Sequence, residues 1–145
     1  MFKHVLIPTD GSELSQAAAV KGLRFAKEIG ARVTGLHVTP AFHVLTFDTV
    51  MIEETREEFL ADSQAQGDKR MAQFKRSAAE EGVPFEAVIE SSDHPYEAIV
   101  RVAMARECDL ILMASHGRRG VQALLLGSET QKVLAHTRIS VLVVR

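Results

Sequence analysis

Five short apolar runs, separated by segments with helical periodicity, constrain the fold of this chain more than any other feature. Several runs are continuously apolar, which is typical of parallel strands that are covered on both faces. Strand and helix patterns alternate to the end, so the sequence predicts a doubly wound α/β sandwich of three layers, with a five-stranded parallel sheet and four helices. The predicted strands are Lys3 to Ile7, Arg32 to Val38, Phe85 to Ile89, Leu110 to Met113 and Val141 to Val144.

The predicted helices follow from apolar positions that recur every three or four residues. The first two span about Ser12 to Ile29 and about Glu53 to Glu81, and each is followed by a glycine, a common residue at helix ends. The third begins around His94, and the fourth follows Ser128, which with Gln131 predicts a capping box. The residues expected to face the core are Ala19, Leu23, Ala26, Phe59, Phe74, Ile99, Val102, Ala103, Val133 and Leu134.

Composition and length exclude several classes of protein. The 145 residues are 46% apolar and 25% charged with a formal net charge of −2, which favours one globular domain over residues 1–145. A charge this close to neutral gives no basic footprint for nucleic acid or an anionic membrane. No apolar run approaches the roughly 20 residues that cross a bilayer, and the first residues do not resemble a signal peptide. We therefore expect a cytoplasmic protein without nucleic-acid or membrane partners.

Cysteine and histidine positions predict neither a disulfide nor a protein metal cage. The one cysteine, Cys108, cannot form an intrachain disulfide and is expected to be buried beside the fourth strand. The six histidines do not have the spacing of a zinc site. His116 has no partner carboxylate that the sequence identifies, so it is not interpreted as a catalytic acid or base.

Two loops at predicted strand ends suggest a nucleotide site. The first strand leads into Pro8-Thr9-Asp10-Gly11-Ser12, and the fourth leads into a small-residue loop that contains Gly117, Gly127 and Ser128. Backbone N–H groups of such a loop and of a helix start can face phosphate. In an open parallel sheet, ligands bind beyond the carboxyl ends of the strands where strand order reverses. If the two strands are neighbours, the loops form the walls of one crevice.

These residues resemble the universal stress protein family over nearly the whole chain. The matching pieces are 5–12, Leu36-His37-Val38, 109–113, the glycine loop and 141–144. ATP-binding members of the family have a Gly, two residues, a Gly, nine residues, then Gly and Ser or Thr. This chain matches that motif except for Ala114 at its first position. The resemblance implies strand order 3-2-1-4-5, ATP or AMP or ADP bound with Mg or Mn, and a homodimer paired through the last strand.

The motif and the two strand ends define the candidate nucleotide-binding residues. If the backbone at Ala114 were left-handed, the missing glycine would cost roughly 1 to 2 kcal/mol. We favour the alternative that Ala114 is the last strand residue, where alanine costs little. Several candidates have structural alternatives as caps, turn glycines or core residues. The candidates are Pro8, Thr9, Asp10, Val38, Met113, Ala114, His116, Gly117, Arg118, Gly127, Ser128, Glu129 and Thr130.

Three functions remain open at this point: a nucleotide-responsive stress or signalling module, a slow ATPase, and a dimeric scaffold that has lost its ligand. The chain has no GxxxxGK[ST] loop, which argues against dedicated phosphoryl transfer. A phosphoacceptor receiver domain is rejected because Asp10 lacks the paired acidic residue of that family. An exposed edge strand at Val141 to Val144 favours a homodimer, since natural proteins cover or pair such edges. The apolar connection from Thr39 to Met51 also needs cover from the domain, a ligand or a second subunit.

Overall fold

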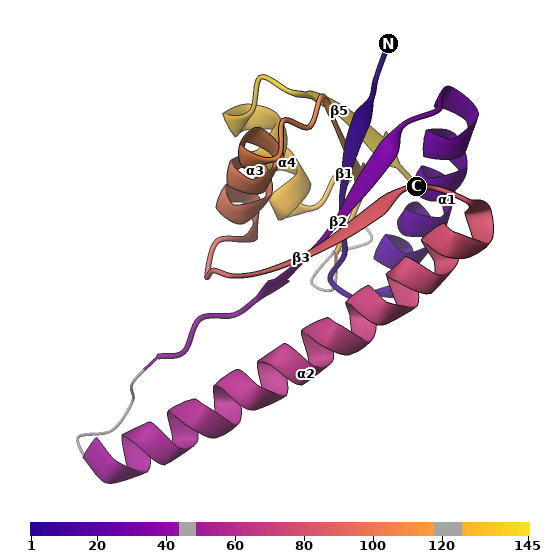
Figure 1. Ribbon diagram of the computed structural model, residues 1–145. Helices are drawn as coiled ribbons and strands as arrows, with labels where there is room; N and C mark the ends of the chain where they lie inside the picture. The colour runs from indigo at the N-terminus through magenta and orange to yellow at the C-terminus, as the bar shows by residue number, and fades with distance from the viewer. Residues whose placement is uncertain (44–48, 118–125) are drawn as a thin grey trace.

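The computed structural model describes residues 1–43, 49–117 and 126–145, and within them a parallel sheet lies between two layers of helices (Figure 1). The strand order is β3-β2-β1-β4-β5, and every neighbouring pair is parallel, which confirms the predicted fold. In chain order the elements are β1 (His4–Pro8), α1 (Glu13–Ile29), β2 (Arg32–Thr39), α2 (Thr49–Glu81), β3 (Phe85–Ser91), α3 (Pro95–Ala105), β4 (Leu110–Ala114), α4 (Ser128–His136) and β5 (Ser140–Val144).

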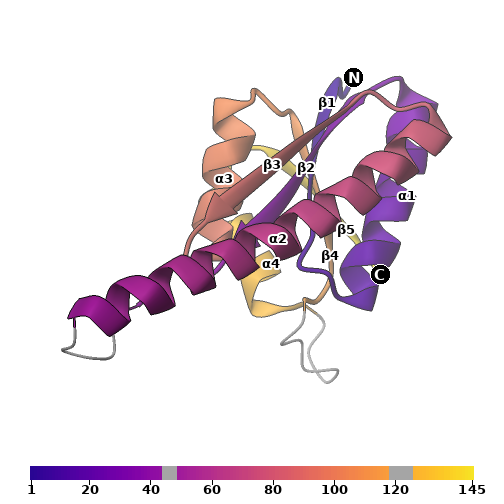
Figure 2. The ribbon, with the colours of Figure 1, turned by 60° about the horizontal axis from the view of Figure 1, so that its bottom comes forward.

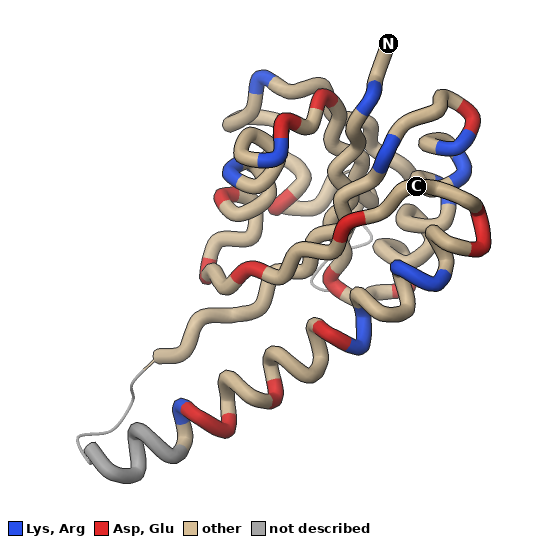
Figure 3. The backbone as a smooth tube through the Cα atoms, in the orientation of Figure 1, with Lys and Arg blue, Asp and Glu red and all other residues tan. Residues whose placement is uncertain are grey.

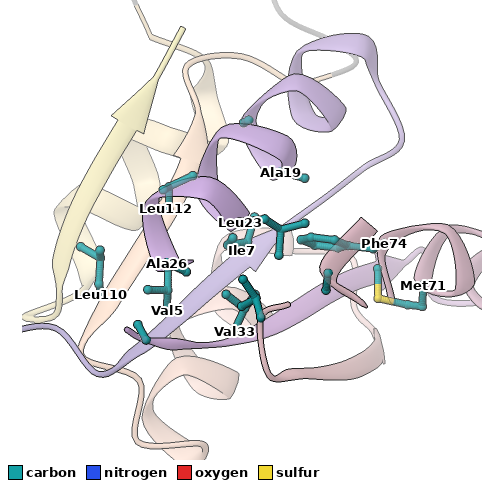
Figure 4. Packing of buried hydrophobic residues seen from close by; sticks show 14 residues of the cluster. Val5, Ile7, Ala19, Leu23, Ala26, Val33, Met71, Phe74, Leu110 and Leu112 are labelled. Atoms are coloured by element: carbon teal, nitrogen blue, oxygen red, sulfur yellow. The ribbon is translucent and has the colours of Figure 1, made fainter. Parts of the chain in front are cut away.

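Side chains of the central strands alternate between two separate cores. Val5 and Ile7 of β1 pack with Leu23 of α1 and Phe74 of α2 on one face (Figure 4). Leu6, between them in sequence, belongs to the core under α3 and α4. This alternation explains why the strands read as continuous apolar runs. Each fully buried Leu, Ile or Val contributes about 1.5 to 3 kcal/mol relative to an exposed one, so both faces of the sheet are strongly fixed.

The ends of α1 follow the sequence signals. Ser12 is the N-cap, and its hydroxyl accepts a hydrogen bond from Ser15 N at 3.2 Å. Gly30 ends the helix with φ +68°, a left-handed conformation that glycine adopts without a side-chain clash. Ala19, Leu23 and Ala26 are buried, as predicted from the helical spacing.

The capping box predicted for α4 is wrong. Gly127 is the N-cap, Ser128 is already the first helical residue, and no side chain caps the helix. The shift of one residue places Gln131 beyond the third helical position, and its amide Nε2 instead donates to Leu126 O at 2.9 Å. Val133 is buried as predicted, whereas Leu134 is 43% exposed and does not face the core.

Helix α2 is packed along only part of its length. It begins at Thr49, four residues before the predicted start, and its residues Met71, Phe74 and Ala78 lie in the core. Residues 55–66 are exposed or half-buried, and this part of the helix extends beyond the sheet (Figure 2). Most of its charged positions are acidic (Figure 3). Phe59 contacts Phe42, with ring centroids 5.6 Å apart, and not the core that we predicted for it.

Candidate functional site

The two predicted loops meet at the carboxyl edge of the sheet. β1 and β4 are hydrogen-bonded neighbours, with Val5 opposite Leu110. A Cβ atom added to Gly117 would lie 2.5 Å from Asp10 Oδ2, so only a residue without a side chain fits there while Asp10 keeps its position. The expected pairing of the two strands is therefore confirmed, and the loop after β1 lies against the start of the loop after β4.

The loop after β1 is held by hydrogen bonds within the loop and to β2. Pro8 ends β1, and Thr9 N donates to Leu36 O at 2.8 Å. Asp10 Oδ1 accepts a hydrogen bond from Ser12 N at 2.9 Å, which closes a turn at the end of β1. Its second oxygen is the one nearest Gly117. The same carboxylate therefore shapes the loop after β1 and lies next to Gly117 of the loop after β4.

The loop after β4 requires glycine because two backbone segments approach closely. Gly127 N donates to Ser115 O at 2.6 Å, and a Cβ on Gly127 would lie 3.1 Å from His116 Cα. Gly127 has φ −68°, so a left-handed backbone is not the reason for this glycine. Glycine at this position allows the start of α4 to pack closely against the backbone that follows β4.

Ala114 is the last residue of β4 and pairs with Val144. Among the residues that the structure describes, the only non-glycine with positive φ is Glu107. The strand-end interpretation of Ala114 is confirmed, and alanine carries no left-handed backbone penalty there.

The remaining candidates divide between the edge of the sheet and the surrounding framework. Met113 is buried, and Val38 is half-buried against the core under α3 and α4. Thr130 Oγ1 donates to Ala114 O at 3.0 Å, and Glu129 Oε2 accepts from Tyr96 N at 2.9 Å, so both residues fix α4 in place. His116 Nδ1 lies 3.1 Å from Ser115 Oγ. Arg118 lies outside the described residues.

Two residues that the sequence did not single out also reach this edge. His37 of β2 is buried, and its Nδ1 lies 3.0 Å from Thr9 O. Arg70 of α2 has Nη1 3.3 Å from His37 Nε2. The position of His37 beside Val38 at a predicted strand end was the available signal, whereas no local pattern indicated Arg70.

A hollow of about 300 Å³ lies between α1 and α2. Its lining includes Thr9, Gly11, Arg70 and Phe74, but neither Asp10 nor Gly117. This hollow is therefore not the crevice that the sequence suggested, although both share the loop after β1.

Within 1–43, 49–117 and 126–145, no group of three or more His, Cys, Asp or Glu residues is arranged to hold a metal ion. None of the helices in this part of the chain combines the length and apolarity that crossing a bilayer requires.

Comparisons with known proteins agree with this architecture. A universal stress protein of Thermus aquaticus is 34% identical over 146 residues, with all of both chains covered. The solved structure of the universal stress protein UspA from Lactobacillus plantarum has a TM-score of 0.85 at 25% identity, covering 99% of this chain and 98% of that one.

Two further solved structures share the fold at lower identity. One is a universal stress protein in complex with cAMP, with a TM-score of 0.73 at 20% identity and coverage of 99% and 97%. The other is from Archaeoglobus fulgidus in complex with dAMP, with a TM-score of 0.65 at 14% identity and coverage of 100% and 98%. The model of the universal stress protein family matches residues 1–145. The chain belongs to the universal stress protein family.

Proposed function

We propose that this protein binds an adenine nucleotide at the carboxyl edge of its sheet, and that ATP, ADP or AMP binding biases its conformation or its dimer state in stress signalling. The observation that carries the proposal is the close approach of Asp10 and Gly117 at this edge, where a Cβ at position 117 would lie 2.5 Å from Asp10 Oδ2. Two proteins of the same fold whose solved structures contain cAMP and dAMP support it.

The residues at this edge suit the parts of a nucleotide. Backbone N–H groups near Gly117 and at the start of α4 would face the phosphates, because a helix start favours anions. Asp10 Oδ2 would accept a hydrogen bond from a ribose hydroxyl, and Val38 and Met113 would contact the base. Arg118 is the candidate for a further phosphate contact. A magnesium or manganese ion would come with the nucleotide and keep several of its waters.

A homodimer through β5 is part of the proposal. The strand is at the edge of the sheet next to β4, and Leu142 is 36% exposed. Pairing with the same strand of a second copy would satisfy both backbone edges under two-fold symmetry. Light scattering at micromolar concentration should give the dimer mass, and Val143→Asp should shift it towards the monomer. A wild-type monomer at that concentration contradicts this part of the proposal.

Calorimetry tests nucleotide binding directly. We expect ATP with magnesium to bind with a micromolar Kd, which corresponds to about 8 kcal/mol, and to raise the melting temperature. Gly117→Val should abolish both effects while leaving the nucleotide-free fold intact. Mass spectrometry of the purified protein should detect any nucleotide carried through purification.

Two control variants separate binding from stability. Ala114→Gly restores the family motif and should change the affinity by less than about twofold, since the missing glycine costs little at an extended position. Gly30→Ala places a side chain at φ +68° and should cost about 1 kcal/mol of stability without changing the affinity. No thermal shift of the wild type at millimolar ATP would favour the dimeric scaffold instead, and slow ATP turnover would favour the ATPase.

A further inference from the structure

We propose that His37 and Arg70 are positioning residues of the nucleotide site, which hold the loop that carries Asp10 from the side of α2. The inference rests on the proposed nucleotide function and adds to it two residues outside the motif. Neither side chain needs to touch the ligand, because both act through the backbone of Thr9 and Gly11.

The hydrogen bonds of His37 define its protonation state. Its Nδ1 lies 3.0 Å from the carbonyl oxygen of Thr9, which can only accept, so Nδ1 carries the proton. Its Nε2 lies 3.3 Å from Arg70 Nη1, and a guanidinium can only donate, so Nε2 accepts. Both contacts are satisfied together by the neutral imidazole with its proton on Nδ1. The ring thus links α2 to the end of β1 in one defined orientation.

Arg70 also lies directly against the loop. A Cβ atom added to Gly11 would be 2.5 Å from Arg70 Nε and 2.6 Å from its Cζ, and Gly11 has φ +79°. A side chain at position 11 would therefore be strained by the backbone and would overlap the guanidinium. Gly11 follows Asp10 in sequence, so the guanidinium lies one residue from the proposed ribose contact.

Close packing of α2 on the sheet places Arg70 at this point. Gly67, one helical turn earlier, is buried, and a Cβ there would lie 3.1 Å from Ile89 and 3.3 Å from the His37 ring. The following residues Met71 and Phe74 anchor the same part of the helix in the core. Arg70 is consequently fixed where the exposed part of α2 meets its packed part.

The loop after β1 is therefore held on three sides before any ligand arrives. On the β2 side, Leu36 O accepts from Thr9 N and His37 Nδ1 donates to Thr9 O. On the other sides lie Arg70 of α2 and Gly117, which borders Asp10. A loop that is already ordered avoids the entropy cost of ordering on binding. Loss of the His37 contacts should therefore lower nucleotide affinity, although the His37 ring itself need not touch the nucleotide.

The first experiment compares His37→Leu with His37→Asn, using calorimetry with ATP and amide hydrogen exchange at Gly11 and Ser12 without nucleotide. The leucine variant leaves the Thr9 carbonyl without its donor, and we expect about tenfold weaker binding and faster exchange. The amide nitrogen of asparagine can take the place of Nδ1 and should restore both measurements to within about threefold of wild type.

Matched variants control for the loss of a buried histidine and of a helical arginine. His4→Leu removes a buried histidine at the opposite edge of the sheet and should not change ATP affinity. Arg70→Met should weaken binding several-fold, whereas Arg76→Met, exposed on the same helix, should have no effect. Circular dichroism and thermal melting confirm that each variant is folded.

Two results overturn the inference: unchanged affinity and exchange in His37→Leu and Arg70→Met, or equal losses in the leucine and asparagine variants, which would indicate packing alone. If the wild type binds no adenine nucleotide, the proposed function fails. Hydrogen exchange in the nucleotide-free variants then decides by itself whether His37 and Arg70 hold the loop, with faster exchange supporting the inference and unchanged exchange overturning it.

Discussion

The two edges of the sheet are built differently. At the amino edge, the Asp109 carboxylate accepts hydrogen bonds from Lys3 N at 2.8 Å and His4 N at 3.0 Å, and Asp109 N donates to His4 O at 3.0 Å. Cys108 and His4 are buried beside these bonds. At this edge, backbone groups of Lys3, His4 and Asp109 are therefore engaged in hydrogen bonds within the protein.

At the carboxyl edge, two glycines allow neighbouring segments to approach more closely than a side chain would permit. Gly117 borders Asp10, and Gly127 approaches His116 and Ser115 through the backbone. From this difference we expect substitutions at the amino edge to change the stability of the fold, and substitutions at the carboxyl edge to change nucleotide binding. Four predictions test that division.

The largest effect is expected for the reactivity of Cys108. Burial raises the pKa of its thiol to about 11 from the ordinary 9.0. Two pKa units lower the thiolate fraction at pH 8 roughly 100-fold, so alkylation by iodoacetamide should be at least about 100-fold slower in the native protein than in urea. Mass spectrometry measures the two alkylation rates. Alkylation of glutathione with and without urea controls for any effect of urea on the reagent itself. Comparable native and unfolded rates would show that the amino edge is open.

Asp109→Ala should lower the free energy of unfolding by about 1.5 kcal/mol, because two backbone N–H groups lose a charged acceptor that water replaces only in part at this exposed position. Urea denaturation measures this loss, and Asp62→Ala on the exposed part of α2 is the control. Burial acts to raise the pKa of Asp109, but the His4 and Lys3 N–H donors outweigh it and lower the pKa.

The lowered pKa of Asp109 gives its contribution a pH window. The stabilisation should be present above about pH 4, where the unfolded carboxyl is also ionised, and lost as the pH falls further. The folded variant should bind ATP as the wild type does. Weaker ATP binding by folded Asp109→Ala would break the division between the edges.

A double-mutant cycle tests the carboxyl edge. Gly117→Ala should displace the Asp10 carboxylate and weaken ATP binding about tenfold, which corresponds to about 1.4 kcal/mol. In an Asp10→Ala background the same change should cost less than about twofold, because the overlapping oxygen is gone. Calorimetry of the four proteins measures the coupling. Additive losses would mean that Gly117 acts independently of Asp10.

The smallest effect is expected for His4. Burial, followed by the charge of Arg32, lowers the pKa of its ring, and Nδ1 has no hydrogen-bond partner among the described residues. The unfolded chain therefore binds the proton more readily, and the stability that neutral His4 contributes is present above about pH 6.5 and lost as the pH falls.

Urea denaturation at pH 7.5 and 5.5 measures this effect of His4. The wild type should lose more stability on acidification than His4→Leu, and His94→Leu controls for removal of an exposed histidine. Equal losses in the wild type and His4→Leu would indicate that water or another group accommodates the charge at the amino edge.

The sequence predicted local elements well where one signal dominated. Continuous apolar runs identified the strands, and Gly30 and Gly82 identified two helix ends, because burial and left-handed backbone leave direct marks on residue type. Prediction failed at α4, where tertiary contacts decide at which residue the helix begins and which of its residues are buried. The start of α4 at Ser128 removed the capping box, and Leu134 lies on the exposed side of α4, next to the buried Val133.

Phe59 shows a further limit of local patterns. Its helical spacing matches a core position, but α2 extends past the sheet there, so the ring contacts Phe42 instead. The hydrophobic period of a helix indicates which face is apolar and not how far its neighbours reach.

By itself, the sequence determined the succession of strands and helices along the chain and the two loops at the strand ends. These features depend on residues that are neighbours in the sequence. Only the tertiary structure decided that Gly117 must leave room for Asp10, and that His37 and Arg70 reach the loop from below. The Thr9–His37 and His37–Arg70 contacts join residues that are 28 and 33 positions apart in the sequence. Such pairs are set by how α2 and the strands pack, which local periodicity does not encode.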